Sequence, residues 1–364
     1  MADWGRRFTA RYRFMRVSRA TGNEVGVLTM LKGGTVTRNN DVRVYDRAEA
    51  ECIGRFDIGA DLVRIYMTAT WPDGTSEDVC LGTFVPYSPS RDVKTGYTTA
   101  SVKMNGRLQE LLDDGFAKPV TLTKGTNAVK AAADVCRQQG IEVIADESDF
   151  EITRTRSYGI GLDTSEDNVS ETKLDMVNDL LSLAGFRAAK TDPYGRVLLK
   201  RYVDLDGTTA SWDFTEGPDA RFEREMTDER DTSAIANHVV TTYRTDEGTF
   251  IGEAWDDDPG SEFSTAAIGR AITKGYTYNE LPSGSTDAER QQAADRMAKK
   301  YLAQNQSVVH KVTVSHVYAP VSVNDAVNLV YPSAGISGKY EVRVQQISLS
   351  GGCPVKATLR NYRR

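Results

Sequence analysis

The chain has 364 residues, of which 40% are hydrophobic and 26% charged, and its formal net charge is -6. Charges of both signs are interspersed, so the composition excludes bulk disorder, and the acidic balance argues against a general nucleic-acid binder held by phosphate contacts. No apolar run approaches the roughly 20 residues of a membrane-spanning helix, and the basic, aromatic N-terminus lacks the apolar centre of a secretory signal. The length suits about two to three compact domains.

Alternating apolar and polar residues dominate the first part of the chain. Between Val63 and Trp71 every second residue is apolar, which is the pattern of a half-buried strand. Pro72-Asp73-Gly74 has the chemistry of a turn, and a partner strand is expected at about 78–87. Short strands at this spacing indicate a barrel or a sandwich. We therefore expect residues 1–115 to form a first β domain.

Helical periodicity begins in the stretch from Tyr97 to Ala133, which we interpret as the junction between this β domain and an insertion. Thr126 has the chemistry of a helix N-cap, and Gly140 suits the left-handed residue that ends a helix. The apolar stripe between them is formed by Val129, Ala132, Ala133 and Cys136. A second helix is expected over 172–184, and a hairpin should follow it. Residues 116–206 are thus predicted to be an inserted α/β domain.

Strand signals return from residue 207, and a loop and a helix interrupt them at about 244–306. The segment from Glu253 to Ser264 is acidic and rich in Gly, Pro and Ser, which indicates a loop. Thr286 and Glu289 have capping-box spacing. The helix that they begin repeats its apolar residues every four positions, at Ala293, Met297 and Tyr301. We predict that residues 207–364 form a second β domain, and that the chain as a whole is α+β and mostly β.

The cysteines and histidines show no spacing typical of a metal site. No CxxC pair occurs, so we interpret the cysteines as buried or reduced thiols; they are Cys52, Cys80, Cys136 and Cys353. A zinc site at His238, His310 or His316 would need ligands from distant segments. His310 and His316 share one parity of a predicted strand, and with Asp325 they could form a general base and its orienter. Because no serine or cysteine nucleophile motif is present, we interpret these histidines as structural.

Acidic clusters give further candidates. Asp256-Asp257-Asp258 could belong to a calcium site, but it lacks the alternating spacing of an EF-hand loop and is interpreted as a solvated loop. Asp113-Asp114 and Asp146-Glu147 could supply the two carboxyl groups of a glycosidase. A chain with 51 acidic residues produces such pairs by chance, and Asp113-Asp114 suits a turn. We therefore predict no catalytic, cofactor-binding or metal-binding residues and no cofactor.

Two other patterns match ligand-binding motifs only in part. Gly33-Gly34 and Gly159-Ile160-Gly161 lack the strand–loop–helix context of a dinucleotide or phosphate loop. Near the N-terminus, arginines and aromatic residues interleave, which suits either contact with nucleic acid or a strand that docks on a neighbouring subunit. The residues of this basic-aromatic segment are Arg6, Arg7, Phe8, Arg11, Tyr12, Arg13, Phe14 and Arg16.

Taken in chain order, these segments resemble the hub proteins of phage tails and of related contractile injection machines. The likeness is an ordered pattern over nearly the whole chain and contains no catalytic signature. It begins at the junction Ser101–Asn105 and the helix Arg107–Asp114, and it continues at the opening of the insertion helix, Thr123–Val129. The remaining segments are Gly185-Phe186, Gly195–Leu199, Asn237–Val240, Ala288–Leu302, Asn324–Leu329 and Tyr340–Val342.

The resemblance implies a structural virion protein of the tail tip or baseplate, made in the host cytoplasm, and not an enzyme. It implies a homotrimer whose subunits each place two tube-like β domains, residues 1–115 and 207–364, in a pseudo-sixfold ring. That ring would adapt the sixfold tail tube to threefold tip structures. The implied partners are the distal tail or tail-tube ring protein, the tape-measure protein and a tail spike or fibre. DNA would cross the channel without specific binding.

Two other functions stay open at this point. One is a tail-tip enzyme that degrades the cell wall, either a peptidoglycan hydrolase or an endopeptidase. The other is a β-rich module that binds host glycans. The scarcity of tryptophan, with four residues in all, counts mildly against it. Because the chain stops at Arg364, just after its last β segment, we expect a bare hub without such extensions.

Overall fold

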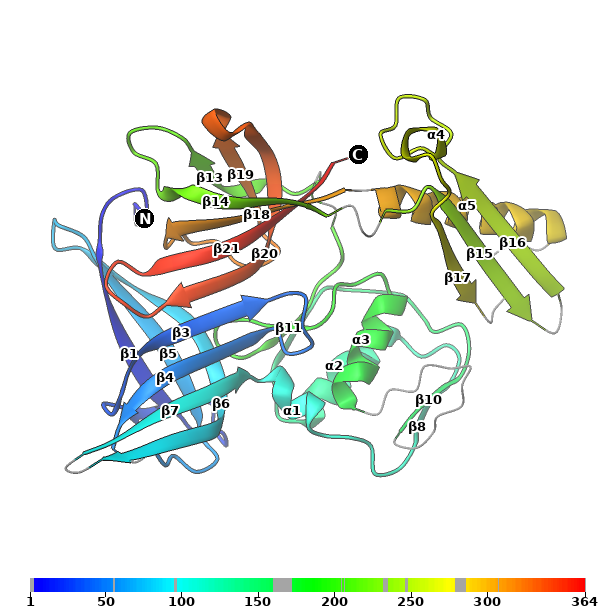
Figure 1. The fold of residues 1–364 in the computed structure, drawn as a ribbon. Coiled ribbons are helices and arrows are strands. Elements are labelled where there is room, and N and C mark those ends of the chain that lie inside the picture. Colours follow the sequence, from blue (N-terminus) through cyan, green and yellow to red (C-terminus); the bar gives the residue numbers. More distant parts are fainter. Residues whose placement is uncertain are drawn as a thin grey trace. The chain divides into compact units, whose positions relative to one another are not determined.

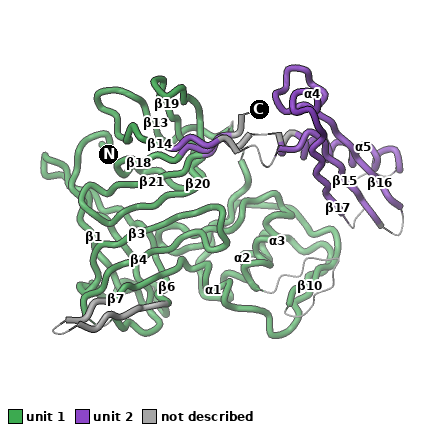
Figure 2. Tube along the Cα trace, viewed as in Figure 1, with its two compact units in different colours: residues 1–226, 313–359 green, residues 227–312, 360–364 purple. Residues whose placement is uncertain are grey.

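The computed structural model describes residues 3–54, 56–94, 97–159, 172–203, 205, 207–231, 235–245, 248–278, 286–306 and 308–363. The chain divides into two compact units, coloured green and purple in Figure 2. Unit 1 contains residues 1–226 and 313–359, and unit 2 contains residues 227–312 and 360–364. Within the described ranges, no helix has both the length and the apolar character needed to cross a membrane.

One large sheet of thirteen strands dominates the fold (Figure 1). Its main path runs β14-β18-β21-β20-β3-β4-β7-β6-β5-β1-β2, while β19 pairs with β20 and β13 pairs with β19. A short 3-10 helix, η1 (Pro332–Ala334), follows β19. In chain order the strands are β1 (Thr9–Val17), β2 (Glu24–Val27), β3 (Leu31–Asn39), β4 (Asp46–Ile53), β5 (Leu62–Thr70), β6 (Ser76–Lys94), β7 (Tyr97–Gly106), β13 (Ala210–Thr215), β14 (Phe222–Asp231), β18 (Val308–Val317), β19 (Ala326–Tyr331), β20 (Ile336–Ser348) and β21 (Pro354–Arg363).

The pairing of β3 with β20 joins strands from opposite ends of the chain. Val36 of β3 lies opposite Ile347 of β20, and both side chains belong to one buried core with Val355 of β21. The mostly β, α+β class is thereby confirmed, and the described strands form open sheets with no closed barrel. The division of the chain into domains at residues 115 and 206 stays a prediction.

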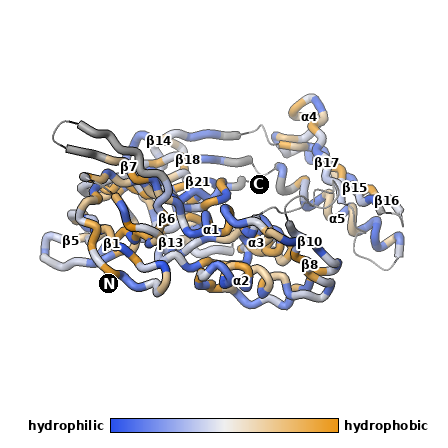
Figure 3. The backbone as a smooth tube through the Cα atoms, turned by 90° about the horizontal axis from the view of Figure 1, so that it is seen from below, coloured by the Kyte–Doolittle hydropathy of each residue, from blue (hydrophilic) through white to orange (hydrophobic). Residues whose placement is uncertain are grey.

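Strand β5 shows why these residues form strands. Its apolar residues are fully buried and alternate with partly exposed polar ones, as the sequence predicts; the buried ones are Val63, Ile65, Met67 and Ala69. Gly74, with a φ of 85°, completes the turn to β6, and Thr70 then pairs with Ser76. Figure 3 shows hydrophobic and hydrophilic positions following one another along such strands.

Between β7 and β13 the chain forms a smaller α/β structure with sheets β10-β8 and β11-β12-β9. Asn127 caps α2 by accepting a hydrogen bond from the Lys130 amide at 2.9 Å. The prediction of Thr126 as the cap is wrong by one residue, because its hydroxyl donates to the Thr123 carbonyl in the preceding turn. Gly140 has a φ of 71°, as predicted for a helix end. The elements are α1 (Leu108–Leu112), β8 (Val120–Leu122), α2 (Ala128–Gln138), β9 (Val143–Ala145), β10 (Arg156–Tyr158), α3 (Lys173–Leu183), β11 (Lys190–Thr191) and β12 (Val197–Leu199).

Unit 2 contains a three-stranded sheet, in the order β16-β15-β17, and the long helix α5. Thr286 and Glu289 exchange capping hydrogen bonds at the start of α5, as predicted. Of the predicted apolar stripe, Ala293 is buried and Tyr301 packs against the core, while Ala294, Ala298 and Leu302 beside them are also buried. The strand β16 also extends to Trp255, into the stretch predicted as a loop. The elements are β15 (His238–Thr245), β16 (Gly248–Trp255), α4 (Thr265–Ile268), β17 (Thr273–Tyr278) and α5 (Asp287–Gln306).

Candidate functional site

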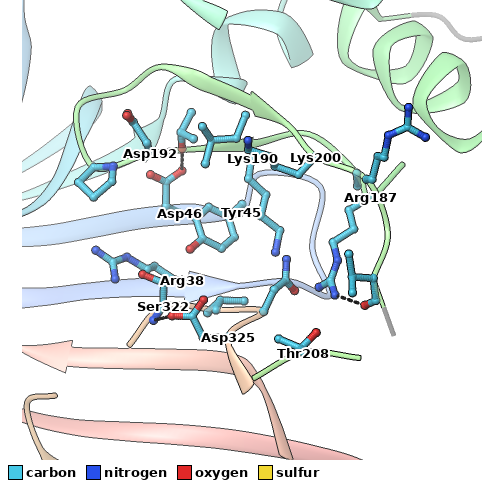
Figure 4. Close-up of a pocket in the computed structure, with 18 of the residues that line it drawn as sticks. Arg38, Tyr45, Asp46, Arg187, Lys190, Asp192, Lys200, Thr208, Ser322 and Asp325 are labelled. Atoms are coloured by element: carbon cyan, nitrogen blue, oxygen red, sulfur yellow. Dashed lines mark hydrogen bonds between the residues drawn. The ribbon is translucent and has the colours of Figure 1, made fainter. Parts of the chain in front are cut away.

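A cavity of about 560 Å³ lies in unit 1, where β3 and β4 meet the hairpin β11–β12 and the loop before β19 (Figure 4). Charged side chains from segments far apart in the sequence line it. Its cations are Arg38, Arg187, Lys190, Lys200 and Arg201, and its acids are Asp46, Asp192 and Asp325. Charged side chains of both signs therefore gather where the sheet meets the segment between β7 and β13.

Asp46, at the start of β4, connects the sheet to the insertion. Its side chain is buried, and its Oδ1 accepts a hydrogen bond from the Thr191 hydroxyl at 2.9 Å. Burial raises the pKa of the Asp46 carboxyl to about 6, against the opposing effects of Thr191 and the Arg38 guanidinium. Gly106 leaves room for this carboxylate, because a Cβ at that position would lie 1.7 Å from its Oδ1.

Glu341 of β20 holds two arginines beside the cavity. Its Oε1 accepts a hydrogen bond from Arg187 Nη1 at 2.6 Å, and its Oε2 accepts one from Arg343 Nη1 at 3.3 Å. Arg187 also donates to the Val203 carbonyl at 2.8 Å. Both oxygens of this buried carboxylate are thus engaged, which compensates for its burial.

Lys190, on β11, has a different environment. Its Nζ is buried without a hydrogen-bond partner and lies 5.1 Å from the centroid of the Tyr45 ring. Figure 4 shows its side chain extending between Tyr45 and Arg187. Burial, together with the nearby guanidinium groups of Arg187 and Arg343, lowers the pKa of the Lys190 amine to about 7.

The structure does not bring His310, His316 and Asp325 together. His310 Nε2 contacts the carboxylate of Asp228, whereas His316 packs against the Phe214 ring at 4.7 Å. Burial lowers the pKa of His316 to about 4, so its imidazole is neutral at pH 7. The remaining histidine, His238, stacks on Trp255 and contacts the Glu253 carboxylate at 2.8 Å. His316 and His238 therefore have packing and pairing roles.

The predicted acidic pairs are engaged in local contacts. Asp114 accepts from Lys173 and Gln139, and Asp146 accepts from Lys200 at 2.7 Å. Hydrogen bonds from these lysines lower the pKa of both carboxyls, which is the opposite of what a general acid requires.

The acidic loop Asp256-Asp257-Asp258 forms internal turns. Asp256 is buried and accepts hydrogen bonds from the Asp258 amide and the Ser261 hydroxyl. In the part of the chain that the structure describes, no three His, Cys, Asp or Glu side chains are grouped as a metal site.

The remaining sequence candidates lie in strands and turns. Gly34 occupies a bulge of β3, where a Cβ would lie 1.9 Å from the Glu49 carbonyl oxygen. In the basic-aromatic segment, Arg6, Arg13 and Arg16 form ion pairs, such as Arg16 with an aspartate at 2.6 Å. All four cysteines are free and buried, as predicted. Residues 160 and 161 of the second glycine motif lie outside the described residues.

Comparison of the fold with solved structures gives a consistent set of neighbours. A tail protein from Neisseria meningitidis MC58 matches with a TM-score of 0.68 and 14% sequence identity, covering 96% of each chain. The 43 kDa tail protein of prophage MuSo2 from Shewanella oneidensis matches with a TM-score of 0.63 and 12% identity, covering 96% of this chain and 97% of that one. The chain has the fold of phage tail proteins.

The same tail-protein fold extends to secretion machinery. An Escherichia coli component of the type VI secretion system, described as structurally similar to the T4 tail proteins gp27 and gp5, matches with a TM-score of 0.51 and 10% identity, covering 93% of this chain and 76% of that one. No family model matches the sequence, and neither does any curated protein.

Sequence reasoning missed the residues that converge on the cavity of this tail-protein fold. Arg38 and Lys190 come from distant segments, and neither stands in a recognisable motif. The one local signal is the turn Asp192-Pro193-Tyr194-Gly195, which places the hairpin beside β6: Thr83 donates its hydroxyl to the Pro193 carbonyl at 2.9 Å. That signal predicts a hairpin but not what it packs against.

Proposed function

We propose that this protein is a structural virion protein, the trimeric hub of a phage tail tip or baseplate, without catalytic activity. The observation that carries the proposal is the end-to-end likeness of fold to the Neisseria tail protein, which covers 96% of both chains.

The sheet edge at β2 supports assembly into a ring. All four residues of β2 are exposed, including Val25 at 57% and Val27 at 54%, and this strand ends the path of the large sheet. An edge strand with exposed valines invites pairing with another chain. In a closed trimer the β2 edge of each subunit would be covered by its neighbour. Rotational symmetry would thus remove all three copies of this aggregation-prone surface.

In this proposal residues 1–115 and 207–364 supply two tube-like domains per subunit, and residues 116–206 form the insertion between them. Three subunits then present six similar modules to the tail-tube or distal-tail ring. The axial channel would hold the end of the tape-measure protein and later let DNA pass. The net charge of -6 suits such a channel, because an acidic wall repels phosphates.

The absence of catalysis is also part of the proposal. Its support is that the described acidic and histidine candidates are engaged in ion pairs, turns or ring packing. Incubation of the purified protein with peptidoglycan tests whether it lacks hydrolase activity. Release of soluble fragments that a single carboxylate or histidine substitution abolishes would favour the cell-wall enzyme instead.

Images of the purified protein test the assembly. Negative-stain electron microscopy should show three-lobed rings with a central hole, and the protein should bind its phage's distal-tail or tail-tube ring protein. Single compact particles that do not bind this ring protein would refute the hub assignment.

A further inference from the structure

We propose that the cavity in unit 1 binds a small oxyanion, a carboxylate or phosphate group, through the side-chain nitrogen of Lys190. This inference rests on the residues of the cavity alone and does not depend on the hub proposal.

Lys190 has unused hydrogen-bonding capacity. Its Nζ is buried and has no hydrogen-bond partner, although an ammonium group carries three donors. The acids nearby are otherwise engaged: Glu341 is held by two arginines, and the Asp325 carboxylate accepts from the Ser322 amide at 2.7 Å. A buried amine without a partner is costly unless a ligand supplies the acceptor.

The lining also contains cations without a carboxylate partner among the described residues. Of its five cationic side chains, Arg187 and Lys200 pair with the carboxylates of Glu341 and Asp146. Arg38 is 6% exposed, and its Nη2 donates to the Leu81 carbonyl at 2.7 Å. Among the described residues no carboxylate lies within ion-pair distance of Arg38 or Lys190. An anionic ligand would supply the missing negative charge to this lining.

The cavity lining also contains a hydrogen-bond acceptor without a partner. The buried Oδ1 of Asn324, which lines the same cavity, has no partner, and Asn324 adopts an uncommon left-handed φ of 75°. A ligand that carries both a charged oxygen and a hydroxyl or amide donor would satisfy Lys190 and Asn324. Hydrogen phosphate and a peptide C-terminus each have both kinds of group.

The cavity also has an open rim and a closed floor. Lys200, Arg201 and Val203 on the rim are exposed, whereas Tyr45 and Leu81 on the floor are buried. A volume of about 560 Å³ is much larger than one ion, so the anionic group can carry an attached small molecule or chain end. The ligand would enter from solvent with its anionic end toward Lys190.

Calorimetric titration of the full chain with sodium phosphate or sodium acetate, at constant ionic strength set with sodium chloride, tests the site. We expect saturable binding of at least one anion, and a Lys190→Met variant should bind about tenfold more weakly or not at all. The control is Lys32→Met, since Lys32 of β3 is exposed and does not line the cavity. This control should bind almost as the unsubstituted protein does.

A conservative variant distinguishes loss of the binding site from misfolding. Lys190→Arg keeps a cation at the position and should retain saturable binding, and thermal unfolding in chloride shows whether each variant is folded. Phosphate binding without acetate binding would assign a phosphate ligand, and the reverse would assign a carboxylate. Equal binding by Lys190→Met and the unsubstituted protein, or no saturable binding of either anion, would overturn the proposal.

The pH dependence gives an independent readout. Because the pKa of the free amine is lowered to about 7, binding in the unsubstituted protein should weaken relative to binding in Lys190→Arg as the pH rises from 6 to 8.5, and this comparison cancels the titration of phosphate itself. The charged and titratable groups that face this amine are Arg187, Arg343, Glu341, Asp325 and Tyr45. Identical pH profiles for the two proteins would assign any binding to another site.

Discussion

The hydroxyl of Thr191 donates a hydrogen bond of 2.9 Å to the buried carboxylate of Asp46 and so joins two segments 145 residues apart in the chain. One partner begins β4 of the large sheet, and the other ends β11 of the insertion. The contact lies beside the cavity in which Lys190 and Arg38 have no paired carboxylate. This junction thus combines a structural connection with the proposed anion site.

Substitution of Asp46 by Asn should alter the pH dependence of stability. The pKa of Asp46 is raised from 3.8 to about 6 in the folded protein, so the folded state binds more protons than the unfolded state between these values. The contribution of Asp46 to the free energy of unfolding therefore falls as the pH rises from about 4 to 6, and it stays lower at higher pH. Asn keeps an acceptor for Thr191 without the charge, so Asp46→Asn should be more stable than the unsubstituted protein at pH 7.5, by about 1–3 kcal/mol.

Denaturant unfolding of both proteins at pH 4.5 and pH 7.5 measures this difference. The advantage of Asp46→Asn should shrink at the lower pH, where Asp46 itself becomes protonated. Parallel pH profiles for the two proteins would show that the carboxyl titrates normally.

Gly106→Ala should loosen the same junction. The new Cβ would lie 1.7 Å from Asp46 Oδ1, so the carboxylate must move and its hydrogen bond with Thr191 must break. We expect the unfolding free energy to fall by about 1–3 kcal/mol. Gly26→Ala is the matched control, because a Cβ on this strand glycine meets no atom within 4 Å. Equal losses in the two variants would mean that the packing at Gly106 is not the cause.

Glu341→Ala should be more damaging than removal of a surface acid. It leaves the guanidinium groups of Arg187 and Arg343 partly buried without their shared carboxylate. Loss of one partner from a buried ion pair typically costs about 3–5 kcal/mol. The control is Asp134→Ala, whose partner Arg137 is exposed, and for which a change of about 0–1 kcal/mol is expected. Chemical unfolding compares the two, and similar small losses would contradict the role given to Glu341.

Local patterns in the sequence predict much of this fold, because they depend on neighbouring residues. The alternation in β5 and the capping box at Thr286 follow from period and spacing alone. The junction at Asp46 does not follow from period and spacing, since it depends on which distant strands pair. For the same reason the pairing of β3 with β20 and the convergence of Lys190 with Arg38 leave no local trace.

In the helix α5 the spacing predicts only part of the buried face. Ala293 is buried as predicted, but the sheet also contacts the backbone of Ala294, where Gly252 has no side chain. A Cβ on Gly252 would lie 2.1 Å from the Ala294 carbonyl oxygen, and the Thr241 hydroxyl donates to that same oxygen at 3.0 Å. The partner strand thus selects which face of the helix is buried.

Gly252→Ala should therefore disrupt unit 2. The added methyl group meets helix backbone, which cannot rotate away, and we expect a loss of about 3 kcal/mol. Hydrogen exchange should become faster in β16 and α5, while exchange in β5 is unchanged. Gly275→Ala, in the same sheet, meets no atom within 4 Å and should leave exchange unaltered. Unaltered exchange in Gly252→Ala would contradict the close helix–sheet contact.

The hub proposal depends first on the number of subunits in the assembled protein. Sedimentation equilibrium of the full chain over a range of concentrations measures it directly. The account predicts a species of three times the 40.1 kDa chain mass, which Arg substitutions at Val25 and Val27 on the exposed β2 edge should weaken. A mass of 40.1 kDa at every concentration would contradict the account.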